Sequence, residues 1–371
     1  MTLIAGFFDG RCPILMGDLL VSDTDKSDKE FVFPTVGKVT KNHLSNGKYS
    51  PSQLSQKVTL LSPKLAICCA NKKIYASCFI KEIFKANVHE NPSQERLFDI
   101  YNAIGGQGNL SVIGLYRDGS EMRIFDFESW PVDPPNSEFK YFKAAGSGYG
   151  ALLDIAPNIK MKVASGKPNK LEKGIANSLQ LITSLLSKEI LEPASLQELF
   201  GVGYEIVHPL GSGLSKFKDL TYGFWTVEEE QTRSWRMVPF PFLAFNYSYH
   251  GDILVIRSVR ISSGKHANSC KIDSDHLHVI LPAYRTVDPY ELTGYSPTSL
   301  NSKWMCNVFL WKNVHDNMGA FFTFGKYDTE SPPVIWRNEF GKNEGIDINT
   351  GFLKSSMEKI ISMFSENHSE Q

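Results

Sequence analysis

The opening of the chain constrains its fold more than any other segment. Two apolar runs, 3–8 and 13–16, flank the dipeptide Asp9-Gly10. An Asp-Gly pair between two strand-like runs is the strongest short-range signal for a β-hairpin. We therefore expect Thr2 to open a β-strand and Asp18 to lie near the far end of its partner strand.

Thr2 acquires an unusual chemistry if Met1 is removed. One residue then carries both a hydroxyl nucleophile and a free α-amine that can accept the hydroxyl proton, a combination that enzymes use for catalysis. The unperturbed pKa of such an amine is about 7.7 to 8.0, so part of it is unprotonated at neutral pH. A small residue after an initiator Met is also common, so Thr2 has an ordinary interpretation beside the catalytic one.

Composition limits the function classes open to the chain. It has 371 residues, a formal net charge of -1, 42% hydrophobic residues and 21% charged residues. These values are typical of a protein with one or two globular domains. Non-specific nucleic-acid binding needs massed Lys and Arg, so we expect no nucleic-acid partner.

The cysteines and the hydropathy pattern bear on the compartment. Six cysteines in so long a chain, with Cys68 and Cys69 adjacent, do not form a disulfide framework and favour a reducing compartment. No uninterrupted apolar stretch reaches ~18 residues, and the N-terminal run lacks a basic leader. We therefore expect a cytoplasmic protein without a membrane partner.

Strands and helices come in groups along the first half of the chain. A second Asp-Gly pair, Asp118-Gly119, predicts another hairpin, and the polar stretch 22–56 indicates a long loop with one short strand. Hydrophobic periodicity predicts strands at 57–61 and 64–70 and helices at 72–86, 93–104 and 169–188. This grouping favours a layered α+β domain over a βαβ winding.

A serine between two glycines follows the strand-like run 141–145. The tripeptide Gly146-Ser147-Gly148 leads into a helical segment at 149–155, which places Ser147 at a helix N-terminus. Its hydroxyl can take part in chemistry there or can only cap the helix. As a nucleophile Ser147 would gain from the helix dipole, but no histidine stands at motif spacing to activate it.

The best candidate linker is the stretch 209–213, Pro-Leu-Gly-Ser-Gly. We therefore expect one domain at 1–210 and a second at 214–371. The second part is rich in aromatic residues and alternating runs, which predicts a β-rich domain. It ends in a predicted amphipathic helix at 352–364.

The first 210 residues resemble a known family, the proteasome-type N-terminal nucleophile (Ntn) hydrolases, which include proteasome β subunits and the bacterial protease HslV. The likeness rests on the Thr2 strand with Asp9-Gly10 and Gly17-Asp18, on Lys57-Val58 before the strand at 66–70, and on the Asp118-Gly119 hairpin before Gly146-Ser147-Gly148. It implies a four-layer αββα sandwich, in which two β-sheets pack face to face between helical layers, with the C-terminal β-rich domain added.

The same resemblance implies a set of catalytic roles. Thr2 supplies the nucleophilic hydroxyl, Lys57 places a cation beside it, and Asp18 holds that cation. Ser147 bonds to the freed amine. Glu198 is the nearest match to the acidic residue that follows the long helix in the family.

Substrate and oxyanion contacts are expected next to these residues. Gly146 and Gly148 let the backbone approach the nucleophile closely. Where the family has a glycine whose N–H forms the oxyanion hole, this chain has Asn71, and Gly201 stands in the place of a serine. The connection that precedes Lys57 is also longer than in the family. The alternatives to Lys57 are therefore Lys38, Lys41 and Lys48.

Several of these residues also have a non-catalytic interpretation. Asp18 can cap the end of a strand, and Lys57 can be a solvated charge on an edge strand. His276 and His278 would point to one face of a strand, but no third metal ligand follows at a fixed spacing, so a structural role is favoured. We expect neither a metal nor another cofactor.

We therefore expect a threonine-type hydrolase that acts on peptide or other amide substrates. The family resemblance also implies a homo-oligomer or ring, and an unfoldase or other partner protein. The alternative is a catalytically inactive assembly or interaction module that keeps the fold without the reaction.

Overall fold

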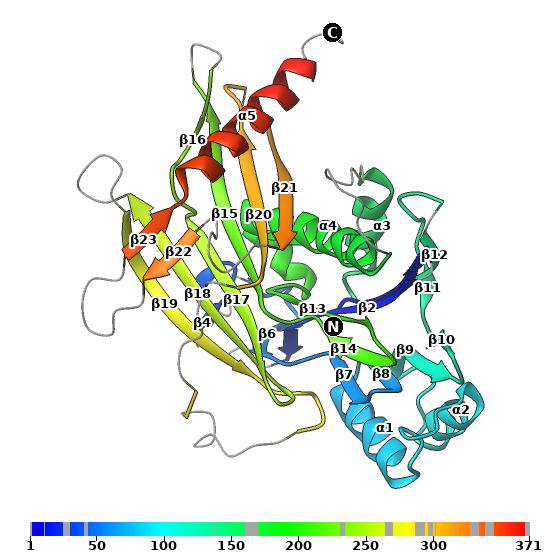
Figure 1. Cartoon of the computed structure of the whole chain (residues 1–371). Helices are drawn as coiled ribbons and strands as arrows, with labels where there is room; N and C mark the ends of the chain where they lie inside the picture. The colour runs from blue at the N-terminus through cyan, green and yellow to red at the C-terminus, as the bar shows by residue number, and fades with distance from the viewer. Residues whose placement is uncertain are drawn as a thin grey trace. The chain divides into compact units, whose positions relative to one another are not determined.

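The chain folds into a mixed α and β structure in which strands predominate, which confirms the coarse class expected from the sequence (Figure 1). The computed structural model describes residues 2–10, 12–24, 30–40, 44–137, 139–159, 170–230, 234–263, 270–285, 294–295, 300, 302–315, 317–326, 334–337 and 345–367. Contacts divide the chain into two units. Unit 1 comprises Met1–Phe217, Tyr249–Leu254 and Val279–Gly294, and unit 2 comprises Lys218–Ser248, Val255–His278 and Tyr295–Gln371.

The predicted opening hairpin is confirmed. Strand β1 (Ile4–Asp9) pairs antiparallel with β2 (Cys12–Asp18), and Gly10 adopts the positive φ of 59° that the tight turn requires. The strand begins at Ile4 and not at Thr2 as expected. The reason is that Asp18 Oδ1 accepts the N–H of Leu3, 2.9 Å, in place of a regular ladder bond.

The hairpin lies at the centre of a six-stranded antiparallel sheet in unit 1. The strand order is β11-β12-β1-β2-β13-β14. The added strands are β11 (Trp130–Pro131), β12 (Phe139–Ala145), β13 (Tyr204–Leu210) and β14 (Gly213–Lys216). The opening hairpin is therefore flanked by β12 and β13, two strands from distant parts of the sequence.

A second, four-stranded sheet packs against the first. It has the order β10-β9-β8-β7, formed by β7 (Val58–Ser62), β8 (Leu65–Asn71), β9 (Leu110–Asp118) and β10 (Glu121–Phe127). The predicted hairpin at Asp118-Gly119 joins its last two strands. Strands β1 and β2 contact β8 and β9. The core between the sheets contains Ile4, Leu15, Val58, Ala66, Cys68, Ile113, Leu115 and Val207.

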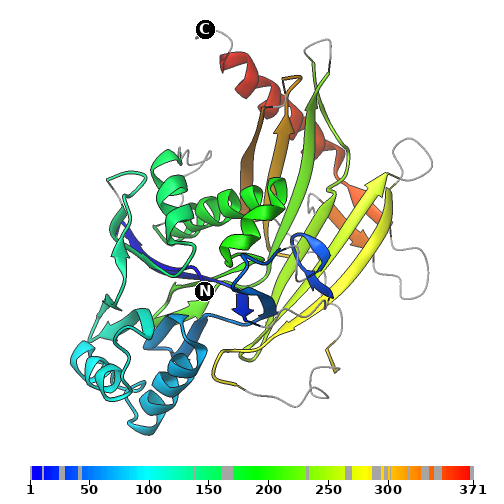
Figure 2. The ribbon, with the colours of Figure 1, turned by 180° about the vertical axis from the view of Figure 1, so that it is seen from behind.

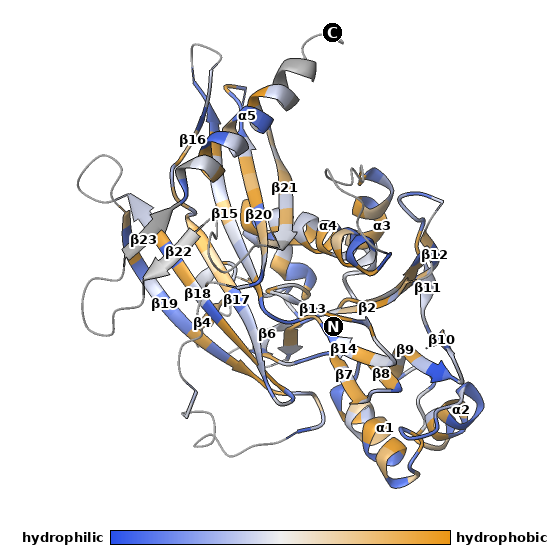
Figure 3. Ribbon diagram, viewed as in Figure 1, coloured by the Kyte–Doolittle hydropathy of each residue, from blue (hydrophilic) through white to orange (hydrophobic). Residues whose placement is uncertain are grey.

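Helices cover the outer faces of both sheets, at positions that the hydrophobic periodicity predicts. Helix α1 (Lys73–Lys85) and helix α2 (Gln94–Ala103) pack on the four-stranded sheet over an aromatic core, and α1 shows both hydrophobic and hydrophilic residues (Figure 3). Helix α4 (Lys170–Leu191) contacts β1, β2 and β13 of the other sheet, and α3 (Tyr149–Ile155) packs beside α4 (Figure 2).

The long polar stretch before Lys57 contains more structure than its composition indicates. One short strand is expected there, but the residues that the structure describes form four: β3 (Leu20–Asp23), β4 (Glu30–Phe33), β5 (Gly37–Thr40) and β6 (Ser50–Leu54). Strand β3 pairs with β6 and β4 with β5. Short, partly exposed strands carry too little apolar periodicity to be recognised from sequence.

The predicted linker at 209–213 is part of a hairpin instead. Strands β13 and β14 pair across it, with Gly211 at a φ of 58°. Glycine-rich turns and linkers share a composition, so the sequence does not distinguish them. The unit boundary falls after Phe217, and the chain later returns to unit 1 at Tyr249–Leu254 and Val279–Gly294.

Unit 2 is built on a seven-stranded sheet with the order β19-β18-β17-β15-β20-β21, to which β16 adds by pairing with β15. Its strands are β15 (Leu220–Glu229), β16 (Trp235–Met237), β17 (Leu243–His250), β18 (Ile253–Ser263), β19 (Cys270–Ile280), β20 (Trp304–Lys312) and β21 (Met318–Lys326). A small pair, β22 (Val334–Arg337) and β23 (Gly345–Ile348), precedes α5 (Thr350–Asn367). The predicted C-terminal helix at 352–364 lies within α5, which packs on a core around Trp225 and Phe309.

Candidate functional site

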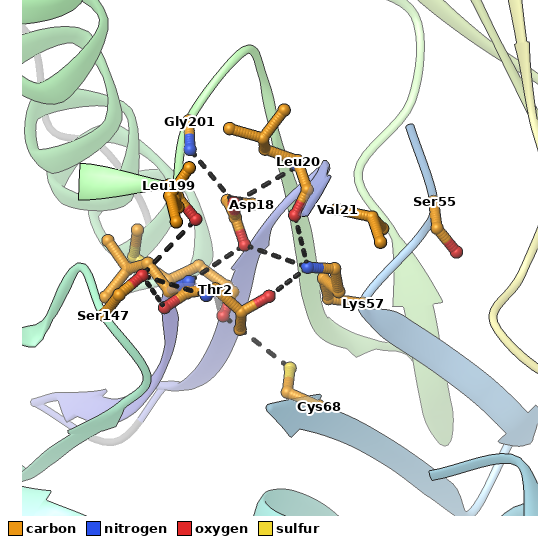
Figure 4. A network of polar contacts seen from close by, with 12 residues as sticks. Thr2, Asp18, Leu20, Val21, Ser55, Lys57, Cys68, Ser147, Leu199 and Gly201 are labelled. Atoms are coloured by element: carbon orange, nitrogen blue, oxygen red, sulfur yellow. Dashed lines mark hydrogen bonds and ion pairs between the residues drawn. The ribbon is translucent and has the colours of Figure 1, made fainter. Parts of the chain in front are cut away.

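The candidate site forms around Thr2, whose side chain is only 2% exposed. Lys57 Nζ donates a hydrogen bond to Thr2 Oγ1 (Figure 4). The backbone nitrogen of Thr2 donates to Ser147 Oγ at 3.1 Å, and its carbonyl oxygen accepts the N–H of Gly148 at 3.2 Å. The hydroxyl and the nitrogen of Thr2 are therefore each held by a side chain that the sequence assigned to the site.

Lys57 lies immediately before β7 and is buried. Besides Thr2 Oγ1, its ammonium donates to the carbonyl oxygen of Leu20 at 2.7 Å and lies 3.6 Å from Asp18 Oδ1. Burial lowers the pKa of Lys57 from its ordinary value, and the negative charge of Asp18 opposes this change. The site thus contains a desolvated cation directly on the threonine hydroxyl.

Asp18, at the end of β2, is fully buried and extensively hydrogen-bonded. Its carboxylate accepts the backbone N–H groups of Leu3 at 2.9 Å, Leu20 at 3.2 Å and Gly201 at 3.0 Å. Burial raises the pKa of Asp18, while the Lys57 charge and the bonds from Leu3 and Gly201 lower it. These contacts stabilise a buried carboxylate that would otherwise be costly.

Gly17 explains why β2 can pass so close to Lys57. A Cβ at Gly17 would lie 3.0 Å from Val58 Cγ2 and 3.2 Å from Lys57 Cβ. Both distances are shorter than ordinary van der Waals contacts. The glycine before Asp18 therefore allows β2 to pack closely against Lys57 and the start of β7 in the facing sheet.

The Gly146-Ser147-Gly148 turn carries the third side chain of the site. Gly146 has a φ of 97°, and a Cβ there would overlap the carbonyl oxygen of Thr2. Gly148, not Ser147, is the N-cap of α3, so the alternative interpretation of Ser147 as only a helix cap is wrong. Its exposed side chain instead accepts from the Thr2 nitrogen and donates to the carbonyl oxygen of Leu199 at 3.3 Å.

The structure does not bring Glu198 to this site. Glu198 ends the short 3₁₀ helix η3 (Pro193–Glu198), where its side chain is 45% exposed and pairs with Lys188 at 3.8 Å. The following residue has a φ of 63°, and its carbonyl oxygen is the group that contacts Ser147. Spacing alone could not predict that the chain turns here and presents backbone instead of a carboxylate.

Two of the three alternative lysines have other contacts. Lys38 pairs with Glu30 at 2.7 Å and is 65% exposed. Lys48 lies over the ring of Tyr49, and Lys41 falls outside the described residues. Among the lysines that the structure describes in this stretch, Lys57 is therefore the one at Thr2.

Asn71 ends β8 and keeps an unusual backbone. Its φ of 78° lies in the left-handed region that favours glycine, the residue expected at this position in the family. Its side-chain Nδ2 donates to Ser111 Oγ at 3.0 Å, so the amide group is tied to β9. An oxyanion role for its backbone N–H stays a prediction.

Sequence reasoning missed Glu189 on α4. This buried carboxylate accepts the hydroxyl of Thr35 and, at 2.9 Å, the backbone N–H of Val202. Burial raises its pKa to about 7, and Asp18 adds to the rise. The signal was present: Glu189 follows Leu185 and Leu186 at helical spacing and so continues the buried stripe.

His276 and His278 in unit 2 lie near each other and not in a metal-binding cluster of described residues. The rings of His276 and His278 lie 6.4 Å apart, and His278 Nε2 is 3.1 Å from Ser258 Oγ. No group of three or more His, Cys, Asp or Glu side chains placed to hold a metal ion occurs in the part of the chain that the structure describes. In the same part, none of the helices has the length and apolar character needed to cross a membrane.

Comparisons with protein-family models and with curated proteins found no match for this sequence. The contacts around Thr2 are therefore the basis for the functional argument that follows.

Proposed function

We propose that the chain is an N-terminal nucleophile hydrolase of amide bonds, in which Thr2 becomes the first residue by loss of Met1. The observation that carries this proposal is the pairing of Thr2 Oγ1 with the buried ammonium of Lys57, while Ser147 holds the Thr2 nitrogen. A nucleophile and its base within one residue, oriented by a third group, match the requirements for covalent catalysis.

In the proposed reaction Thr2 Oγ1 attacks the carbonyl carbon of an amide, and the hydroxyl proton passes to the freed α-amine. The amine then gives this proton to the leaving nitrogen as the C–N bond breaks, which leaves an ester on Oγ1. Water hydrolyses the ester with the amine again as base, and Oγ1 regains its proton. The Lys57 ammonium stabilises negative charge on Oγ1, and Asp18 holds Lys57.

We also infer that unit 1 is the four-layer αββα sandwich of this class. The order of packing supports the inference: α1 and α2 cover the four-stranded sheet, that sheet packs on the six-stranded sheet, and α4 covers the remaining face (Figure 1). Thr2 would then lie just before β1, next to Lys57, which lies just before β7 of the second sheet.

The direct test compares Thr2→Ala with Thr2→Ser on a panel of fluorogenic peptide amides. We expect Thr2→Ala to lose at least ~10³-fold in kcat, because loss of a nucleophile removes the covalent route. Thr2→Ser keeps a hydroxyl and an amine and should retain measurable turnover. Unchanged turnover in Thr2→Ala would reject Thr2 as nucleophile.

A second variant distinguishes the rival nucleophile. Ser147→Ala removes the hydroxyl that contacts the Thr2 nitrogen, so we expect reduced but measurable hydrolysis. Complete loss in Ser147→Ala with full activity in Thr2→Ala would assign the reaction to Ser147. A wild-type protein that starts at Thr2 and cleaves none of the amides would favour the inactive assembly module.

A further inference from the structure

The segment 199–203 has a strained backbone next to the site. Leu199 has a φ of 63° and Val202 a φ of 62°, in the left-handed region that bulky and β-branched residues rarely adopt. Gly201, at 117°, and Gly203, at 143°, are also positive. Such a backbone persists only where its surroundings fix it, and strain of this kind concentrates at functional sites.

Two atoms of this turn contact side chains of the candidate site. The N–H of Gly201 donates to Asp18 Oδ2 at 3.0 Å, and the carbonyl oxygen of Leu199 accepts the hydroxyl of Ser147 at 3.3 Å. Asp18 in turn holds Lys57. The conformation of the turn therefore sets the position of both groups that orient Thr2.

Glu189 is the side chain that holds the turn. Its Oε2 accepts the N–H of Val202 at 2.9 Å, and a Cβ on Gly201 would overlap that same oxygen. Its Oε1 accepts the hydroxyl of Thr35. The carboxyl group, fixed on α4 and 4% exposed, thus occupies the space that a side chain at Gly201 would need.

We propose that Glu189 is a positioning residue, which locks the 199–203 turn so that the backbone of Leu199 and Gly201 can orient Ser147 and Asp18. Its effect on catalysis rests on the proposed function, whereas its effect on the turn rests on the contacts alone.

Glu189 holds the turn through the geometry of its hydrogen bonds and not through its charge. An ionised carboxylate accepts from both Val202 and Thr35, and a neutral carboxyl group can accept from Val202 while donating to Thr35. A glutamine can make the same two bonds with its oxygen and its amide nitrogen. Alanine can make neither. Among the described residues, Asp18 is the charged neighbour whose negative charge raises the pKa of Glu189.

The test measures amide hydrogen exchange in the full chain for Glu189→Ala, Glu189→Gln and the control Glu198→Ala. Loss of one buried bond corresponds to about a tenfold change in local opening, so we expect peptides covering 199–203 to exchange at least ~10-fold faster in Glu189→Ala. Exchange in Glu189→Gln and Glu198→Ala should stay near wild type. Exchange in β8 and β9 serves as the reference for global stability.

Wild-type exchange at 199–203 in Glu189→Ala would overturn the proposal, as would equally fast exchange in Glu189→Gln. If Glu189→Ala does not fold, Thr35→Val provides the second variant, because it removes one of the two bonds to the carboxyl group. We expect faster exchange at 199–203 in Thr35→Val. Unchanged exchange there would also contradict the role of Glu189.

A second arm separates this proposal from the function itself. An acylating β-lactone probe reports on the reactivity of Thr2, and we expect its rate constant for acylation to fall about tenfold in Glu189→Ala and to recover in Glu189→Gln. Normal acylation in a Glu189→Ala chain with a loosened turn would overturn the positioning role. No acylation of wild type would reject the proposed hydrolase, and the exchange result would still decide whether Glu189 locks the turn.

Discussion

Lys57 and Asp18 form a buried ion pair next to the hydroxyl of Thr2. Two charges removed from water cost several kcal/mol each before their attraction and hydrogen bonds compensate, so an apolar pair of similar volume is often as stable. Asp18 accepts three backbone N–H groups in addition to its contact with Lys57. Under the proposed function, this costly pair serves the reactivity of the Thr2 hydroxyl.

Glu189 gives a prediction about pH and stability. Burial raises the pKa of its carboxyl group from 4.5 to about 7 in the folded chain, so the folded state binds the proton more tightly than the unfolded state. The contribution to stability is fully present below about pH 4.5 and is lost as pH rises through about 7. The loss is at most about 3 kcal/mol.

Denaturant unfolding of wild type and Glu189→Gln between pH 4 and pH 8 measures this effect. We expect the unfolding free energy of wild type to fall relative to that of Glu189→Gln as pH rises through this range, and then to level off. Titration of Asp18 is common to both chains and largely cancels. A difference that is independent of pH would show that Glu189 has an ordinary pKa in the folded protein.

The individual site residues could be predicted from sequence only in part. Thr2, Asp18, Lys57 and Ser147 meet in the structure as expected. Each of them stands beside a local signal, such as the Asp-Gly hairpin or the Gly-Ser-Gly turn. Glu189 has a helical-period signal for burial but stands in no recognisable motif, because only the fold brings Thr35 and Val202 to it.

The turn before α3 is the element on which the position of Thr2 depends most. Gly146 is in the left-handed region, and a Cβ added to it would overlap the carbonyl oxygen of Thr2. A Cβ added to Gly150, four residues later in the same segment, would meet no atom within 4 Å. The two glycines therefore form a matched pair for substitution by alanine.

We expect Gly146→Ala to lower the unfolding free energy by about 2 kcal/mol or more, through backbone strain and overlap with Thr2. Gly150→Ala should be neutral or stabilising by up to about 1 kcal/mol, because alanine favours the helix. Chemical denaturation of both variants provides the measurement. Equal stabilities would mean that the turn does not press against Thr2.

Elements with strong local patterns were predictable and those with weak patterns were not. Both Asp-Gly hairpins and helices α1, α2 and α4 match their predicted positions within a few residues. Strands β3 to β6 lack a continuous apolar face and acquire their pairing from each other. The β13–β14 turn was predicted to be a linker for a related reason, because glycine-rich turns and linkers share a composition.

At the scale of the whole molecule, the domain boundary that the sequence predicts differs from the boundary of unit 1. Gln56, next to Lys57, is fully buried, and its Nε2 donates at 2.7 Å to the carbonyl oxygens of Asp252 and Ile280. Its backbone N–H donates to Leu281 at 3.0 Å. Returning segments from the second half thus complete unit 1 directly beside the candidate catalytic lysine.

Gln56→Ala tests the importance of this closure. We expect a loss of about 1–3 kcal/mol in unfolding free energy, because the carbonyl oxygens of Asp252 and Ile280 lose their donor. Gln53→Ala, at an exposed position in β6, is the matched control and should stay within about 0.5 kcal/mol of wild type. If the two variants unfold alike, the returning segments do not stabilise unit 1 through Gln56.

The most direct measurement is mass spectrometry of the intact protein before and after reaction with an acylating β-lactone, followed by mapping of the adduct. We expect the wild-type chain to start at Thr2 and to carry one acyl group on its N-terminal peptide. Neither the Thr2→Ala variant nor a chain that still has Met1 should be acylated. A chain that retains Met1 and is nevertheless acylated and hydrolytically active, or an adduct that maps elsewhere, would contradict a Thr2 nucleophile.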